Sequence, residues 1–425
     1  MSAVAAETSS LIGSGWSLIC PACRMTTAPA AYPRGCPACA EQGRTSAFVV
    51  QYDQVGTLGP EQRTLRGIWK YQGFLPPIDK SLQLSLGEGD TPLVQIPALA
   101  ELTGNDRIYL KLEMCNPTAA HKDRFHAASI AVGKALGYDR AVSWSTGNHG
   151  FSMSSYAAAH GMRAIVVGSM RMPPLIQRAI RFNGGLPLLA PADLCGSVLM
   201  RLIDDGWYPS TTSWPLPAAN PFGIEGYKTI GFDVYQQLGG RMPDIVCVPA
   251  AAGDGVVGFD RAIDDLRRLG LPNTDAQLVP CQPKRANPLV NALDKGLVHV
   301  EEIPDAFSLA LSIADAISGG FALDAIRRSD GFGVAIEDEE IMAAGRLLAK
   351  NGLLVEPSSA ASVAGAIQAI RERPELRERS IVCVITSSGL KWLDDYSTEP
   401  LEGGVTVDSV DEALRAVDRF YAAPV

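Results

Sequence analysis

The chain has 425 residues, of which 47% are hydrophobic and 20% are charged, enough apolar side chains for two or three folded domains. A net charge of −9 argues against nucleic acid as the main partner, because phosphate binding needs a basic face. No apolar run suggests a membrane span, the N-terminal stretch lacks signal-peptide features, and nine cysteines suit a reducing compartment, so we expect a cytoplasmic protein.

The N-terminal region carries two Cys-x-x-Cys motifs that follow a predicted flexible tail over 1–15. Four thiolates can close tetrahedrally on Zn²⁺, and the loop between the motifs has the length found in zinc ribbons. A redox dithiol or unmetallated thiols are the competing interpretations. We predict a structural zinc ribbon over 16–52, with four metal ligands: Cys20, Cys23, Cys36 and Cys39.

A lysine lies where a predicted strand gives way to a helix. After a loop rich in glycine and proline, residues 107–114 alternate apolar and polar side chains as a half-buried strand does. Asn116-Pro117 predicts a turn, and a helix is predicted from Asp123 to Leu136. Lys122 therefore lies at a strand-to-helix corner, where it is either a buried Schiff-base amine or a helix-start lysine paired with Asp123.

Short apolar runs and amphipathic stretches alternate through the rest of the chain. This pattern predicts an α/β protein with two doubly wound, mostly parallel sheets. A last helix, Ser409 to Tyr421, is predicted to lie on the surface, packed through Val410, Leu414, Val417 and Phe420. The predicted strands are 141–144, 164–167, 186–189, 245–248, 278–279, 334–336 and 381–385, and the predicted helices are 152–159, 174–182, 193–203 and 257–269.

Three loops at predicted strand ends carry polar groups. Residues 145–149 suit an amino acid carboxylate, although hydroxyls and amides there also serve as ordinary helix caps. Residues 250–255 form a glycine-bearing loop that suits a phosphate or is simply a tight turn. Asp254 would repel a phosphate, so we expect its side chain to point outward if the loop binds one. Residues 386–391 supply hydroxyls that are either caps or contacts to a ring nitrogen.

Together these segments resemble the threonine synthase branch of the fold-type II pyridoxal-phosphate enzymes. The resemblance covers most of the chain and rests on the ribbon and on motifs in a fixed order: 85–93, 116–118, 122–124, 145–148, 224–229, 356–361 and 386–391. It implies a large cofactor-binding domain over 53–130 and 225–400, a small mobile domain over 131–224, a C-terminal helix over 401–425 and a homodimer.

The resemblance also implies roles for individual residues. Lys122 would carry pyridoxal phosphate, Asn148 would bond the pyridoxal hydroxyl oxygen, and Thr386 would meet the pyridine nitrogen. The cofactor phosphate would be held by Ala251, Ala252, Gly253, Asp254 and Gly255. The amino acid substrate would be bound by Ser145, Thr146, Gly147 and His149, with His121 beside its side chain or in a structural role.

Several positions depart from the family pattern. Ala119-Ala120-His121 stands where the family has Gly-Ser-Phe, Phe125 replaces a glycine, and the phosphate loop lacks its usual asparagines. The helix after Met170 lacks the usual lysine, for which Arg171, Arg178 or Arg181 is the substitute. We therefore expect elimination or replacement at the β or γ carbon of an amino acid, with O-phosphohomoserine as the most specific substrate. The alternatives are a β-replacement synthase or ammonia-lyase for serine-like substrates, and a non-catalytic binding module.

Overall fold

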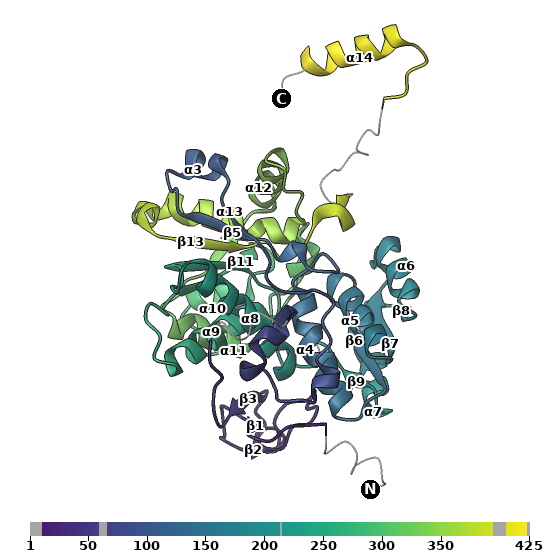
Figure 1. The fold of residues 1–425 in the computed structure, drawn as a ribbon, viewed down its shortest axis with the longest axis vertical. Coiled ribbons are helices and arrows are strands. Elements are labelled where there is room, and N and C mark those ends of the chain that lie inside the picture. The colour runs from purple at the N-terminus through teal and green to yellow at the C-terminus, as the bar shows by residue number, and fades with distance from the viewer. Residues whose placement is uncertain (1–10, 59–65, 213–214, 394–404, 423–425) are drawn as a thin grey trace.

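The strands that the structure describes form three separate sheets (Figure 1). The computed structural model describes residues 11–58, 66–212, 215–393 and 405–422. Within these residues, no helix is both long and apolar enough to cross a bilayer.

The largest sheet has six strands in the order β12-β11-β10-β13-β5-β4, all parallel except β4. Because successive side chains of a strand point to opposite faces, Val246 and Val248 pack with α8, α9 and α11, whereas Ile245 and Cys247 pack with α12 and α13. Both faces are thus buried, which explains the continuous apolar runs of these strands. The strands are β4 Leu93–Val94, β5 Ile108–Lys111, β10 Ile245–Pro249, β11 Gln277–Pro283, β12 Val334–Ile336 and β13 Ile381–Val384.

A second, fully parallel sheet has the order β8-β7-β6-β9. The helices α5, α6 and α7 pack against it, and α4 links it to the larger sheet through its contacts with α5 and α8. The two parallel sheets and their helices confirm the predicted α/β class. The strands are β6 Arg140–Trp144, β7 Arg163–Ser169, β8 Leu186–Ala190 and β9 Tyr208–Pro209.

The third sheet is antiparallel, has the order β2-β1-β3, and belongs to the cysteine-rich segment. Tyr52 at its end donates a hydrogen bond of 2.8 Å to the buried carboxylate of Glu225 on α8. Arg34 forms a 2.8 Å ion pair with Asp204 at the end of α7. The segment therefore contacts helices that belong to both parallel sheets. Its strands are β1 Trp16–Ile19, β2 Thr26–Thr27 and β3 Val49–Tyr52.

Helices begin earlier than the sequence pattern indicates at the loops of interest. The helix predicted from 152 starts at Asn148, and the one predicted from 257 starts at Asp254. The first turns of both helices are made by the loop residues themselves, where polar residues and glycines interrupt the apolar period. The helices are α2 Pro37–Ala40, α3 Pro97–Thr103, α4 Lys122–Ala135, α5 Asn148–Ala159, α6 Pro174–Phe182, α7 Ala192–Asp204, α8 Pro221–Gln237, α9 Asp254–Arg268, α10 Pro288–Asp294, α11 Gly320–Arg328, α12 Asp338–Lys350, α13 Pro357–Glu372 and α14 Val410–Ala422.

Two predictions at the chain ends need correction. Residues 1–10 of the expected tail lie outside the described residues, but Ile12 pairs with Ile78 and Gly13 bonds Pro77, so 11–13 are not frayed. The C-terminal helix forms as predicted, yet Val410 and Leu414 are exposed and not packed. Val410 is 76% exposed and Leu414 is 59% exposed, because an amphipathic pattern fixes a helical face but supplies no surface to cover it.

Candidate active site

A cavity of about 430 Å³ opens where the strands of both parallel sheets end at their carboxyl termini. This is the edge at which α/β folds bind small molecules. Every predicted site residue other than the cysteines lines the cavity. These residues come from four segments far apart in sequence, which the fold brings together: 121–122, 145–149, 251–255 and Thr386.

Lys122 is half-buried in this cavity as the first residue of α4. Its Nζ lies 5.5 Å from the centre of the Tyr227 ring. Burial lowers the pKa of the amine, opposed by the carboxylates of Asp254, Asp315 and Glu356. Desolvation thus favours the free amine, which is the nucleophilic form.

Asp123, the other candidate partner of Lys122, is engaged elsewhere. Its carboxylate accepts hydrogen bonds of 2.6 Å from the Thr118 N–H, the Thr118 hydroxyl and the Ser152 hydroxyl. Asp123 therefore closes the turn before the helix, and the interpretation of Lys122 as a helix-start lysine paired with Asp123 is wrong.

The turn before Lys122 is fastened to the end of β13. The His121 N–H donates to the Thr386 carbonyl at 2.8 Å, and Ala120 pairs with Ser387 in an isolated bridge. Lys391 donates to the Thr118 carbonyl at 2.8 Å. Ala119 adopts φ of 56°, a left-handed conformation that costs an alanine about 1 kcal/mol or more.

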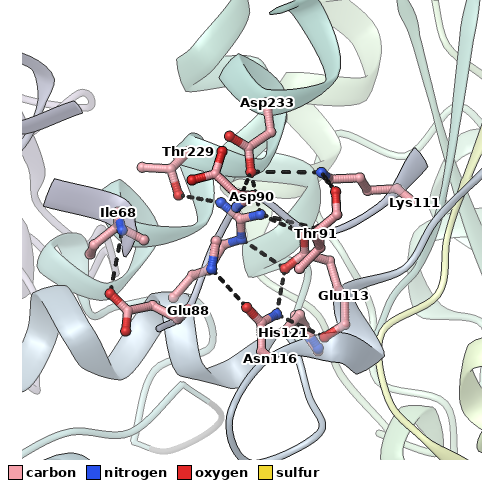
Figure 2. A network of polar contacts seen from close by, with 12 residues as sticks. Ile68, Glu88, Asp90, Thr91, Lys111, Glu113, Asn116, His121, Thr229 and Asp233 are labelled. Atoms are coloured by element: carbon pink, nitrogen blue, oxygen red, sulfur yellow. Dashed lines mark hydrogen bonds and ion pairs between the residues drawn. The ribbon is translucent and has the colours of Figure 1, made fainter. Parts of the chain in front are cut away.

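A buried network of charges lies directly behind the turn (Figure 2). Arg124, whose side chain is fully buried, donates to both oxygens of Glu113 at 2.7 Å and to Asp233 at 2.6 Å. Asn116 donates to Glu113 at 2.8 Å. Lys111 lies 3.6 Å from Asp233. Each buried charge has a counter-charge, so the network fixes α4 against α8 and against the turn that carries Lys122.

The loop 145–149 presents a hydroxyl, an amide and backbone groups to the cavity. The Ser145 hydroxyl accepts from the Gly147 N–H at 3.0 Å. The Asn148 amide donates to Glu356 at 2.6 Å and accepts from Ser387 at 3.3 Å. These bonds hold the Asn148 amide in one orientation, facing the cavity. An amide that orients a ring hydroxyl must be held in this way.

The two histidines of the cavity are uncharged supports in this geometry. His121 stacks on Tyr227 with 5.0 Å between ring centres, and its Nδ1 lies 3.1 Å from the Thr386 carbonyl. His149 Nε2 lies 2.9 Å from the Ser210 carbonyl. Burial lowers the pKa of both rings, that of His149 to about 3. Of the two roles considered for His121, this geometry favours the structural one.

The loop 251–255 leads into the N-terminus of α9, and Gly253 adopts φ of 98° there. Helix N–H groups without internal acceptors make such a turn suitable for an anion. Asp254, however, is only 5% exposed and lines the cavity. Its side chain therefore does not point outward, which is the orientation expected if the loop binds a phosphate, because Asp254 starts the helix and faces the same space as Lys122.

Thr386 lies just beyond the last residue of β13, with its hydroxyl 2.8 Å from that of Ser359 on α13. Ser359 in turn accepts from the Ser387 N–H at 2.7 Å. The pair forms a neutral hydroxyl site at the end of the central strand.

Five residues in or beside the cavity were not assigned a role from sequence. Thr212, Asp315 and Glu356 line the cavity, whereas Tyr227 and Ser359 contact the lining residues Lys122 and Thr386. Tyr227, Glu356 and Ser359 lie inside recognised motifs, so their motifs were a usable signal. Asp315 and Thr212 lie in irregular segments before α11 and after β9, where no residue pattern marked them.

The four cysteines of the N-terminal segment form the metal-ligand cluster that their spacing predicts. Their sulfur atoms all lie within 4.8 Å of one another. The pairs Cys20–Cys39 and Cys23–Cys36 are each 3.6 Å apart. Sulfurs that surround a zinc ion at about 2.3 Å are separated by roughly 3.8 Å, so the cluster fits a tetrahedral metal site.

The cavity residues fit pyridoxal phosphate as a set. The cavity offers an amine of lowered pKa, an oriented amide, a neutral hydroxyl pair and a helix N-terminus, which match the aldehyde, hydroxyl, ring nitrogen and phosphate of that cofactor. The fold and the site together define a cofactor-dependent α/β enzyme with Lys122 as its cofactor lysine candidate.

Comparison with known proteins agrees with this class. Residues 84–387 match the family described as pyridoxal-phosphate dependent enzyme, and the chain belongs to that family. It is 30% identical over 374 residues to a threonine synthase of Methanocaldococcus jannaschii, covering 85% of this chain and 91% of that protein. It is 31% identical over 345 residues to a threonine synthase of Mycobacterium bovis, covering 80% and 92%. The chain is thus a pyridoxal-phosphate-dependent lyase of the threonine synthase-like type.

Solved structures share its fold at lower identity. Maize serine racemase covers 78% of this chain and 92% of its own, with a TM-score of 0.61 at 19% identity. A serine ammonia-lyase from Rhizomucor miehei covers 72% and 97%, with a TM-score of 0.62 at 20% identity. These matches confirm the fold-type II architecture.

Proposed function

We propose that the chain catalyses a pyridoxal-phosphate-dependent elimination or replacement on a small amino acid, most specifically the conversion of O-phosphohomoserine to threonine and phosphate. The single observation that carries the proposal is Lys122, a lysine of lowered pKa inside the cavity that every predicted loop lines. The threonine synthases among its relatives support the specific form.

The residues of this chain would divide the work. When bound, the cofactor supplies a sink for the electron pair at the α-carbon. Lys122 would hold the cofactor, and its free amine would take the α-proton on Nζ. The neutral Ser359–Thr386 pair would face the ring nitrogen without supplying a charge, which would favour loss of a leaving group over transamination. The 145–149 loop binds the substrate carboxylate through its N–H groups and hydroxyls.

A second cavity of about 170 Å³ adjoins the first, since Thr146 and Leu311 line both. Arg171, Ser169 and Ser308 also line it. A cation among hydroxyls suits the phosphate of O-phosphohomoserine. Of the three arginines considered as substitutes for the missing lysine, Arg171 is the one that we assign to this role.

The test is a product screen with O-phosphohomoserine, O-phosphoserine, O-acetylserine, threonine and serine. We expect threonine and one equivalent of phosphate from O-phosphohomoserine. Arg171→Gln should raise KM for that substrate about tenfold while leaving kcat within a few-fold, because a charge-assisted hydrogen bond is lost. Arg178→Gln on the same segment is the matched control. Release of ammonia from serine or threonine, with none of the phosphorylated substrates turned over, would contradict the specific form.

An ammonia-lyase is the second candidate, and the charge of the main cavity favours it. The carboxylates of Asp254, Glu302, Asp315 and Glu356 line that cavity with Lys122. Such a lining suits an uncharged side chain such as that of serine or threonine better than a phosphate. In the same screen this candidate predicts a 2-oxo acid and ammonia.

A β-replacement synthase predicts product only when O-acetylserine or O-phosphoserine meets a second nucleophile. A preparation that takes up no cofactor would favour a binding module.

We propose that the four-cysteine cluster holds structural zinc and that the chain forms a homodimer, as its resemblance implies. Metal analysis should give one zinc per chain, and Cys36→Ser should lower that content. Because β3 packs on α8, loss of the metal should expose Tyr52 and Trp16 to solvent, read by fluorescence. Sedimentation should give twice the mass of the chain. Fluorescence of Tyr52 and Trp16 that does not change after complete metal removal would contradict the structural role of the zinc.

A further inference from the structure

Asp254 combines burial with an unsatisfied atom. Its side chain is only 5% exposed, and its Oδ1 has no hydrogen-bond partner among the described residues. Buried polar atoms in native proteins are nearly always paired, so an orphan inside a cavity indicates a missing ligand group. The orphan belongs to the first residue of α9, within the 251–255 loop.

The surroundings of Asp254 come from four other elements. Lys122 of α4 favours the ionised carboxylate, as does a hydrogen bond from the Thr212 hydroxyl. Asp315, from the segment before α11, disfavours it. Burial, reinforced by Asp315, outweighs the effects of Lys122 and Thr212 and raises the pKa of Asp254 to about 6. On α8, burial raises the pKa of the Tyr227 hydroxyl, and the charge of Asp254 raises it further.

The remaining titratable groups of the cavity lie on other segments. Glu302 and Glu356 add negative charge, and His121 and His149 have lowered pKa values, so both are neutral near pH 7. With the cofactor bound, Lys122 would not offer a free ammonium group. A phosphate at the α9 N-terminus would then face the carboxyl groups of Asp254 and Asp315 without that counter-charge.

A protonated carboxyl resolves this conflict, because it carries an O–H donor whereas a carboxylate only accepts. We propose that Asp254 binds the cofactor phosphate as a neutral acid: the Asp254 carboxyl takes one proton from solvent and donates it in a hydrogen bond from Oδ1 to a phosphate oxygen. The proposal rests on the cofactor of the family and not on the substrate, so it can fail while the proposed function stands.

Cofactor affinity should therefore depend on pH. Binding that takes up one proton weakens tenfold for each pH unit above the pKa of the free group. In calorimetric titrations of the cofactor-free full chain, run in two buffers of different ionisation enthalpy, proton uptake with pyridoxal phosphate at pH 7.5 should exceed that of Asp254→Asn by about one. The variant keeps an N–H donor, so at pH 8 its affinity should equal or exceed that of the wild type.

Two controls isolate the effect. Asp315→Asn should retain the extra proton, because Asp315 is not the donor. Pyridoxal, which lacks the phosphate, should show no difference between wild type and Asp254→Asn. The pyridoxal comparison does not depend on catalytic turnover. The ³¹P shift of the bound cofactor is a second readout that does not depend on it. Equal proton uptake in wild type and Asp254→Asn, or a variant that binds more than tenfold weaker at every pH, would overturn the proposal. If the variant does not fold, the wild type alone provides the test. Equal proton uptake by the wild type with pyridoxal and with pyridoxal phosphate would overturn the proposal.

Discussion

On the Lys122 side of the cavity, the buried charges of Arg124, Glu113 and Asp233 satisfy one another at 2.6–2.7 Å (Figure 2). On the α9 side, Asp254 is also buried, but its Oδ1 has no hydrogen-bond partner in the part of the chain that the structure describes. The pKa values follow this difference: Arg124 lowers the pKa of Glu113 and Asp233 despite burial, whereas burial raises that of Asp254. The paired charges support the fold, and we assign the unpaired oxygen of Asp254 to a ligand.

The largest effect should come from breaking the paired side. Arg124→Met leaves the carboxylates of Glu113 and Asp233 buried without their main counter-charge, so we expect a loss of about 3–5 kcal/mol of unfolding free energy in urea.

The matched control is Arg371→Met, which removes an exposed ion pair with Glu340 of 2.9 Å. It should cost no more than about 1 kcal/mol. Equal losses in the two variants would show that the buried network is not what fixes the corner.

The unpaired side should show the opposite response. The folded pKa of Asp254 is raised to about 6 from 3.8, so its contribution to stability is fully present below the unfolded pKa and is lost as pH rises through 6. The Asp254→Asn variant has no titrating group at this position, so it does not lose this stability as pH rises. The cofactor-free variant should therefore be more stable than the wild type above pH 6, by up to roughly 3 kcal/mol, and equal to it near pH 4. A difference that does not change between pH 4 and 8 would refute the assignment.

The smallest effect concerns the turn that precedes Lys122. Ala119 adopts φ of 56°, which glycine tolerates without a steric penalty. Ala119→Gly should therefore raise the free energy of unfolding by about 1 kcal/mol at most. A clear loss of stability would mean that the methyl group packs more favourably than the conformation costs.

Much of this arrangement could be predicted from sequence, because its signals are local. The Cys-x-x-Cys spacing, the turn at Asn116 and the alternation of strands with helices each depend on neighbouring residues. The orientation of Asp254 could not be predicted. The first turn of α9 contains polar residues, so the apolar periodicity does not show where this helix starts. The contact between Lys122 and Tyr227 depends on how α8 packs against α4, and no local pattern encodes that.

The central claim is that Lys122 carries the cofactor, and borohydride reduction followed by peptide mapping tests it directly. Lys391 is the useful competitor, since burial lowers its pKa to about 8, but its Nζ already donates to the Thr118 carbonyl. We predict a single reduced cofactor adduct on Lys122, absent from Lys122→Ala. An adduct on Lys391, or an unchanged amount of adduct in Lys122→Ala, would contradict the account.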